Sequence, residues 1–255
     1  MTDIIRKIMG AGLFLLAFSL VCGNEARAQS CLTPPSCDTL GYKQTADDCS
    51  GQERVLKCPF DQTKMFCLDT ITQNLEVGAI LYSDMTVTTG IVTGKTPIGV
   101  VFDTNKRLAV AIDQSSSTLT FGGYGTDIPS LVNCTSEPLS CGTDGKANTA
   151  AIIAYGKSNG ISYPAAEYCN KYTTTGTKAG DWHLPSYAEL KSIYNAKSMI
   201  NATLSLLGKS SLTESYYWSS TEYGSYGSWI LCMNNGSNSY DNKNYYYYVR
   251  PVLAF

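Results

Sequence analysis

Apolar and polar positions divide the chain into four stretches with different patterns. Residues 8–22 form an apolar run broken only by small residues, and residues 29–70 contain few apolar side chains. From Val77 onward, GAILYSDM, TPIGVVFDT and KRLAVAID are short apolar runs separated by Gly, Asp and Asn, which is typical of strands. Helical periodicity follows between residues 148 and 200, and strand and turn patterns return after Ser215. Segregated elements of this kind predict an α+β domain with a mainly antiparallel sheet.

The helical region divides into an earlier and a later part. In the earlier part, two sets of residues each share a helical face, which predicts two helical segments. These sets are Ala150, Ile153 and Ala154, and then Ala165, Tyr168, Cys169 and Tyr172. In the later part, Pro185 and Ser186 open a helix, and Glu189 occupies the N3 position of a capping box. The predicted buried stripe of this helix consists of Leu190, Ile193 and Tyr194.

Residues 1–28 have the organisation of a secretory signal peptide. Arg6 and Lys7 precede the apolar run, and Ala26-Arg27-Ala28 supplies an A-x-A cleavage site. The run is short for a membrane span. Lipid attachment at Cys22 is a weaker alternative, since Val21 is bulkier than the small residue expected before a lipidated cysteine. We therefore expect an exported protein that is secreted, periplasmic or associated with the cell surface, with no membrane span after cleavage.

The charge of the chain argues against two classes of partner. The formal net charge is −2, and residues 1–28 hold three basic and two acidic residues, so their removal leaves −3. A mildly acidic chain without Lys/Arg clusters is a poor match for nucleic acid or anionic lipid. We therefore expect no nucleic-acid partner.

Nine cysteines follow the predicted signal peptide: Cys31, Cys37, Cys49, Cys58, Cys67, Cys134, Cys141, Cys169 and Cys232. In an exported protein they predict disulfides, but an odd number leaves at least one unpaired. Five of them lie within residues 29–70, where apolar side chains are too sparse for a core, so we expect a small disulfide module there. A metal site is disfavoured, because this segment has no CxxC pair and no histidine. Cys134 and Cys141 bracket a six-residue loop and predict a local disulfide.

Four motifs occur in order along the second half of the chain: YCNKY, DWHLPSYAEL, YYWSSTE and YVRPVLAF. Together they resemble the bacterial branch of the C-type-lectin fold. That branch contains formylglycine-generating-enzyme-like domains and the variable proteins of diversity-generating retroelements. The resemblance covers residues 77–255 and implies a twisted antiparallel sheet with two main helices. It also implies a ligand-binding domain of a bacterial protein, with a variable region at about residues 218–255.

Other residues of these motifs are expected to be structural. The core candidates are Trp182, Leu184, Trp218, Trp229 and Val252. Arg250 lies inside an otherwise apolar motif, so we expect a structural ion pair or a hydrogen bond to the backbone.

An enzyme is the least favoured of three hypotheses. The formylglycine-generating relatives use a cysteine pair near the C-terminus, and this chain has only Cys232 there. The single histidine, His183, lies in a motif that indicates packing rather than catalysis. Asp181, Glu189 and Glu222 are expected to be capping or surface groups rather than a catalytic pair or a calcium site. We therefore predict no catalytic residue, no cofactor and no metal.

The two remaining hypotheses are a fixed-sequence adhesin or glycan-binding protein, and the same scaffold diversified by a retroelement. Such retroelements randomise adenines, and randomised AAC or AAT codons for Asn give Tyr, Ser, Asp and Gly but never a stop codon. Between Tyr223 and Tyr248, twenty of 26 positions are Tyr, Asn, Ser, Gly or Asp. Tyr, Ser, Gly and Asn are also the residues that antibodies favour at their binding surfaces. This composition predicts a binding face for a protein or glycan on a host or bacterial surface.

Alternation within SWILCMNNG predicts which residues form that face. Trp229, Leu231 and Met233 are expected to lie on the side of a strand that faces the core. Asn235-Gly236 is expected to form a two-residue hairpin turn. The predicted ligand-binding residues are Tyr223, Ser225, Tyr226, Ser228, Ile230, Cys232, Asn234, Ser237, Asn238, Ser239, Tyr240, Asp241, Asn242, Asn244, Tyr245, Tyr246 and Tyr247. Cys232 is expected to be a free surface residue, which leaves eight cysteines for pairing. The alternative is a disulfide between Cys169 and Cys232.

Overall fold

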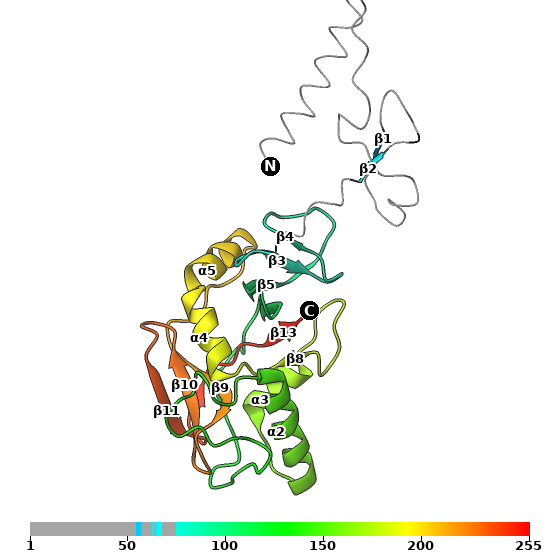
Figure 1. Cartoon of the computed structure of the whole chain (residues 1–255). Coiled ribbons are helices and arrows are strands. Elements are labelled where there is room, and N and C mark those ends of the chain that lie inside the picture. The colour runs from blue at the N-terminus through cyan, green and yellow to red at the C-terminus, as the bar shows by residue number, and fades with distance from the viewer. Residues whose placement is uncertain (1–54, 58–62, 64, 68–74) are drawn as a thin grey trace, which may run out of the picture. The chain divides into compact units, whose positions relative to one another are not determined.

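The computed structural model describes residues 55–57, 63, 65–67 and 75–255, and the chain divides into two units, Met1–Thr72 and Gln73–Phe255 (Figure 1). In the first unit, strand β1 (Val55–Lys57) pairs antiparallel with β2 (Met65–Cys67). The predicted signal peptide lies outside the described residues, and so do Cys31, Cys37, Cys49, Cys58 and the side chain of Cys67. The disulfide module therefore stays a prediction.

Six strands of the second unit form one antiparallel sheet in the order β4–β3–β5–β6–β13–β8. They are β3 (Ile80–Tyr82), β4 (Val87–Thr88), β5 (Pro97–Asp103), β6 (Leu108–Ala111), β8 (Trp182–His183) and β13 (Val252–Ala254). The last strand lies between β6 and β8, with Val252 opposite both Val110 and His183. The C-terminal motif therefore lies inside the sheet and connects distant parts of the sequence.

Two smaller antiparallel sheets are built mainly from the C-terminal third of the chain. One has the order β11–β10–β9, with β9 at Tyr216–Glu222, β10 at Gly227–Cys232 and β11 at Asn238–Asn242. The other pairs β12 (Tyr246–Tyr247) with β7 (Leu119–Thr120). Strand β10 is therefore a central strand, and β11 is an edge strand.

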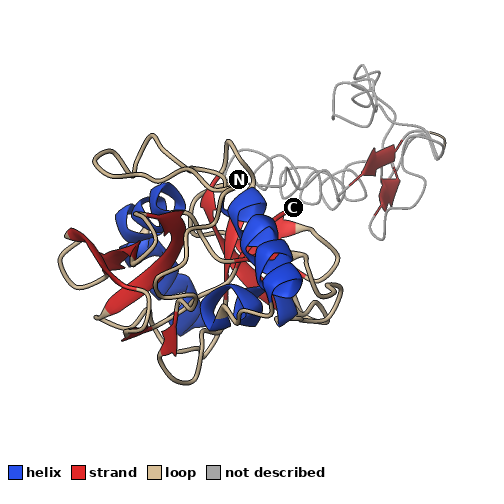
Figure 2. Ribbon diagram, turned by 90° about the horizontal axis from the view of Figure 1, so that it is seen from below, coloured by secondary structure: helices blue, strands red, loops and turns tan. Residues whose placement is uncertain are grey.

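Four helices accompany these sheets in the described part of the second unit, whereas the residue patterns predicted three and the resemblance implied two main ones. Helices α2 (Gly145–Asn159) and α3 (Pro164–Lys171) pack together and contact β8, and α4 (Tyr187–Asn195) and α5 (Lys197–Leu206) contact β5. In Figure 1, α4 and α5 lie to the left of the six-stranded sheet and α2 and α3 lie below it; Figure 2 shows the same helices and strands from below. Helix α5 follows α4 directly and has no side-chain cap at Ala196, so the sequence carries no start signal for it.

The helix predicted around Ala150, Ile153 and Ala154 is confirmed, but the face that these residues share is not its buried face. The buried residues of this helix are Gly145, Thr149, Ile152 and Gly156, whereas Ala150 and Ala154 are exposed. Apolar residues occupy more than one side of α2, so their spacing does not identify the buried side. Close packing selects it instead: a Cβ added at Gly156 would lie 2.6 Å from the carbonyl oxygen of Ile161.

The start of α4 is formed as the capping box predicts. The Ser186 hydroxyl accepts a hydrogen bond from the Glu189 backbone N–H at 3.2 Å, and the Glu189 carboxylate accepts one from the Ser186 N–H at 2.9 Å. Leu190 and Ile193 are buried, and Tyr194 is half-buried. This local pattern positions α4 against β9 and β10.

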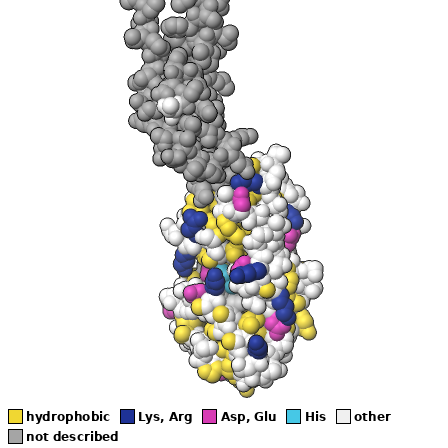
Figure 3. All heavy atoms as spheres, turned by 90° about the vertical axis from the view of Figure 1, so that its right-hand side faces the viewer, with side chains coloured by type: hydrophobic (Ala, Val, Ile, Leu, Met, Phe, Trp, Pro, Cys, Tyr) yellow, Lys and Arg dark blue, Asp and Glu magenta, His cyan; other side chains and the backbone are white. Residues whose placement is uncertain are grey.

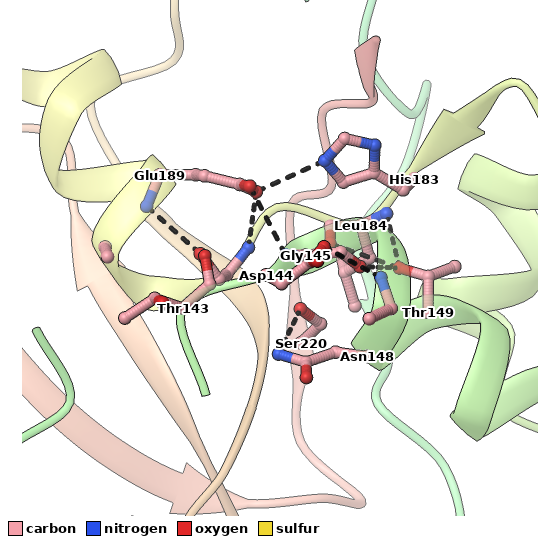
Figure 4. A network of polar contacts seen from close by, with 12 residues as sticks. Thr143, Asp144, Gly145, Asn148, Thr149, His183, Leu184, Glu189 and Ser220 are labelled. Atoms are coloured by element: carbon pink, nitrogen blue, oxygen red, sulfur yellow. Dashed lines mark hydrogen bonds and ion pairs between the residues drawn. The ribbon is translucent and has the colours of Figure 1, made fainter. Parts of the chain in front are cut away.

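A network of polar contacts joins the start of α2 to the start of α4 (Figure 4). In this view the Glu189 carboxylate and the His183 ring point toward one another, and Nε2 of His183 lies 3.2 Å from Glu189 Oε2. Glu189 also accepts a hydrogen bond from the Gly145 N–H at 3.3 Å. A Cβ at Gly145 would lie 2.2 Å from Glu189 Oε2, so only glycine fits there.

The core contains the aromatic and aliphatic residues of the scaffold motifs. Trp182, Leu184, Trp218, Trp229 and Val252 are all buried. Arg250 is buried as well, and its guanidinium donates hydrogen bonds to the carbonyl oxygens of Ala111 and Ile112, each at 2.9 Å. These bonds link the chain beside β13 to the end of β6.

Candidate binding surface

The predicted hairpin forms between β10 and β11, with Leu231 opposite Asn238. Its connection is longer than the two residues expected. The Cys232 N–H donates to the Ser237 carbonyl at 3.1 Å, and the Gly236 N–H donates to the Cys232 carbonyl at 2.8 Å. The connection thus comprises Met233 to Gly236. Gly236 has φ +72° and lies against Tyr194, where an added Cβ would approach the ring to 2.3 Å.

Three predicted surface residues of β10 are buried instead, namely Ser228, Ile230 and Cys232. Alternation assumed that one face of this strand is open to solvent. Packing on both sides of β10 removes that possibility, because Trp229 and Leu231 belong to one core cluster and Ile230 belongs to another. A strand covered on both faces is apolar on both, as in the sequence WILCM.

The remaining predicted residues are accessible to different degrees. The exposed ones are Tyr226, Asn234, Ser237, Asn238, Ser239, Tyr240, Asn244, Tyr245 and Tyr246. The half-buried ones are Tyr223, Ser225, Asp241, Asn242 and Tyr247. We call these two groups together the display surface. They lie on edge strand β11, on the hairpin connection, and on the chain segments at the other end of the hairpin.

Ring contacts order the tyrosines of the display surface. The rings of Tyr223 and Tyr240 stack with centroids 3.7 Å apart and an interplanar angle of 7°. Tyr240 also packs edge-on against Trp229 at 5.7 Å. Tyr247 packs on Trp218 at 5.0 Å and donates a hydrogen bond to Asp241 at 2.5 Å. Burial and this hydrogen bond raise the pKa of Tyr247. These tyrosines are anchored to the core at one edge.

A buried ion pair fixes the chain at Lys243, between the display-surface residues of β11 and those from Asn244 to Tyr247. Lys243 is buried, and its ammonium donates to the Glu222 carboxylate and to the carbonyl oxygen of Thr126, the latter at 2.8 Å. Glu222 was predicted to be a capping or surface group, and that prediction is wrong. Burial raises the pKa of Glu222 even though Lys243 acts to lower it. The one basic residue within the Tyr/Asn/Ser-rich run was the signal that could have revealed this anchor.

The sequence hypothesis also missed Tyr124. This residue lies in the loop formed by residues 121–126, about a hundred residues before the display surface. Its side chain is 50% exposed, and its ring centroid lies 5.2 Å from that of Tyr226. A tyrosine flanked by glycines, in FGGYGT, was the available signal.

The residues that were weighed as catalytic candidates or as disulfide partners lie as follows. His183 is buried, with its Nδ1 lacking a hydrogen-bond partner among the described atoms, and Asp181 accepts a bond from the Lys178 N–H. In the part of the chain that the structure describes, Cys169 and Cys232 are both unpaired and buried. Cys232 is therefore free, as predicted, but it does not lie at the surface, and the disulfide role expected for Cys169 is wrong. Burial raises the pKa of the Cys169 thiol. The Cys134–Cys141 disulfide is confirmed.

Two further properties concern the part of the chain that the structure describes. It contains no group of three or more His, Cys, Asp or Glu side chains placed to hold a metal ion. No helix within it is long and apolar enough to cross a membrane.

The α+β architecture, its antiparallel sheets and the C-terminal hairpin define a C-type-lectin-like domain. Residues 133–253, somewhat less than half of the chain, match the family model of the Lcl C-terminal domain. The expected relationship to the C-type-lectin-fold variable proteins is thereby confirmed.

One solved structure with a similar fold is a fimbrial protein from Bacteroides ovatus, with 17% sequence identity and a TM-score of 0.56. The similarity covers 71% of this chain and 49% of that one, so this chain spans about half the length of that structure. At this identity the similarity shows the fold alone. No curated protein matches the chain at a significant level.

Proposed function

We propose that this chain is a surface, adhesin-like binding protein without enzymatic activity, and that the display surface contacts a protein partner. One observation carries the proposal: Tyr226, Tyr240, Tyr245 and Tyr246 are 59%, 49%, 48% and 65% exposed. Tyrosine offers a large amphipathic contact area at a low cost in conformational entropy, and the neighbouring Asn and Ser side chains supply adaptable hydrogen bonds.

The backbone beneath these tyrosines is already ordered before any partner binds. Strand β11 is paired with β10, Tyr240 is stacked on Tyr223, and Lys243 is held by Glu222. Ordering a flexible loop at an interface weakens binding, so a preorganised surface binds more tightly than a floppy one of the same composition.

The shape of the display surface favours a protein partner over a small saccharide. A cavity of about 420 Å³ lies beside Asp113, Lys209 and Arg250, and another of about 560 Å³ lies between α2 and α3. Neither cavity is lined by the four exposed tyrosines. Aromatic rings about half exposed or more are typical of protein–protein contacts, whereas small ligands are usually enclosed in a concave site.

The charge distribution and the fold comparison are in keeping with this function. On the face of the second unit that Figure 3 shows, Lys and Arg side chains are spread out, with acidic side chains among them. Such a face lacks the continuous basic stripe of a nucleic-acid-binding protein. The fimbrial protein of similar fold supports an exported or surface location by analogy of fold.

A retroelement is our proposed origin of the display surface. Its exposed positions are Asn, Ser or Tyr, the residues that adenine randomisation of Asn codons produces. The buried positions Ser228, Ile230 and Cys232 would not serve diversification for binding. Sequencing beside the gene tests this origin: a reverse transcriptase and a near-copy of the gene's end that differs at adenines would support it. A genome with neither element leaves a fixed-sequence adhesin.

A binding assay on arrays tests the function itself. The purified full chain is applied to arrays of purified host and bacterial surface proteins and to glycan arrays. One variant replaces four exposed tyrosines with Ser: Tyr226, Tyr240, Tyr245 and Tyr246. A matched control variant replaces, also with Ser, four similarly exposed apolar residues outside the display surface: Ile91, Val132, Leu139 and Leu206. We expect binding to a protein that only the tyrosine variant loses. Binding that the tyrosine variant keeps, or binding to glycans alone, contradicts the proposal.

A further inference from the structure

We propose that the loop of residues 121–126 is a constant second part of the binding face, and that Tyr124 contacts the same protein partner as Tyr226. This inference rests on the proposed function and adds a residue from outside the variable region. It implies that part of the contact surface remains unchanged whatever sequence the display surface carries.

Three hydrogen bonds attach this loop to Ser225 of the display surface and to the buried Lys243 beside that surface. The Gly122 N–H donates to the Lys243 carbonyl at 3.1 Å, and the Gly125 N–H donates to the Ser225 carbonyl at 3.0 Å. The Lys243 ammonium donates to the Thr126 carbonyl at 2.8 Å. Because two of the three are made by backbone groups only, they persist when neighbouring side chains of the variable region change. The loop and the display surface therefore move as one body.

The two glycines before Tyr124 allow the loop to pack closely against the core. Gly122 has φ +97°, and a Cβ there would lie 2.2 Å from the Ser162 carbonyl oxygen. Gly123 has φ +62°, and a Cβ there would lie 2.5 Å from the ring of Tyr163. Only glycine combines these backbone angles with so close an approach. A hydrogen bond from the Thr126 N–H to the Gly123 carbonyl, at 2.9 Å, closes the turn around Tyr124.

This geometry leaves Tyr124 directed outward beside Tyr226. The two rings meet edge to face, with centroids 5.2 Å apart and an interplanar angle of 68°. Half of Tyr124 and 59% of Tyr226 remain accessible, so the pair presents its outer surface to solvent rather than filling the core. Aromatic residues held rigidly on a surface are typical anchors of protein interfaces. A partner that covers Tyr226 must therefore also lie within reach of Tyr124.

Selection against a defined protein can test this inference without knowledge of the natural partner. The full chain is displayed with Tyr or Ser allowed at the exposed positions Asn234, Ser237, Asn238, Ser239, Tyr240, Asn244, Tyr245 and Tyr246. Binders are selected against purified lysozyme, and the Kd of several independent binders is then measured with Tyr124→Ser. Leu206→Ser, at a residue 55% exposed at the end of α5, is the matched control.

We expect Tyr124→Ser to weaken most selected binders about tenfold or more, as for a central interface residue, and Leu206→Ser to leave their Kd unchanged. Hydrogen exchange of residues 122–126 should slow in the lysozyme complexes. Binders that keep their Kd with Tyr124→Ser, and in whose complexes this loop exchanges as fast as in the unbound chain, overturn the inference while leaving the proposed function intact. A library that yields no binders overturns both.

Discussion

Replacing Lys243 with methionine would test whether the display surface depends on a buried ion pair. Both side chains of the Lys243–Glu222 pair have no exposed surface, and the ammonium also donates to the Thr126 carbonyl. Methionine retains most of the aliphatic length of lysine but removes the charge and the donors. The variant therefore leaves the Glu222 carboxylate buried without its cation.

The expected loss of stability is large for a single substitution. Removing one partner of a buried ion pair costs about 3–5 kcal/mol, because the other charge stays buried and uncompensated. For a folded unit of this size, each kcal/mol lowers Tm by roughly 2–4 °C. We therefore expect Tm to fall by about 6–20 °C, the product of these two ranges.

The loss should also depend on pH in a defined direction. Burial raises the pKa of Glu222, and the hydrogen bond and charge of Lys243 lower it, so Lys243→Met raises the pKa further. A carboxyl group whose pKa is higher in the folded than in the unfolded state destabilises the fold as pH rises through the folded pKa. The deficit of the variant relative to the wild type should therefore be greater at pH 8 than at pH 5.

Unfolding in urea, followed by tryptophan fluorescence at both pH values, provides the measurement. All three tryptophans of the chain, Trp182, Trp218 and Trp229, are buried in the second unit. The double variant Glu222→Gln, Lys243→Met should regain most of the lost stability. Lys171→Met removes an ion pair with Glu167 in which the lysine is 71% exposed, and it should change stability by no more than about 0.5 kcal/mol.

Two results would refute this reasoning. One is a Lys243→Met variant within about 1 kcal/mol of the wild type at pH 8, which is well below the range for a broken buried pair. The other is a double variant as unstable as Lys243→Met alone, because the uncompensated charge would then not be the cause.

Two further predictions concern the hairpin and the buried thiols. Gly236→Ala should destabilise the protein by about 1–3 kcal/mol more than Gly208→Ala in thermal unfolding. Both glycines have positive φ, but only Gly236 lies against a ring, that of Tyr194. Equal losses of stability in the two variants would contradict this role of the ring contact. Alkylation of the unreduced protein, followed by peptide mapping, should show Cys169 and Cys232 modified only after denaturation, since both thiols are free and buried. An intact disulfide between them would contradict this prediction.

Local sequence signals were reliable where one element contains the whole interaction. The capping box at Ser186 and Glu189 involves residues three apart, and the Cys134–Cys141 disulfide closes a short loop. The hairpin was also identified by its Asn-Gly dipeptide, although its connection is longer than expected. In each case the interacting groups are neighbours in sequence, so their spacing is sufficient.

Interactions between distant segments were not accessible in this way. Alternation along β10 could not reveal that a second core cluster covers Ile230, because the pattern of one strand does not specify the layers around it. In α2, the buried face is the one on which Gly156 closely approaches the chain near Tyr163, a contact between separate segments. The partner of Glu222 is twenty-one residues away, at Lys243.

The sequence by itself determined that the C-terminal region is rich in Tyr, Asn and Ser between scaffold motifs, because composition and local spacing need no third dimension. Only the tertiary structure decided which of these residues reach solvent. It excluded Ser228, Ile230 and Cys232 from the display surface and placed Tyr124 beside Tyr226. The physical reason is that exposure depends on which segments pack against each other, and this packing joins residues far apart along the chain.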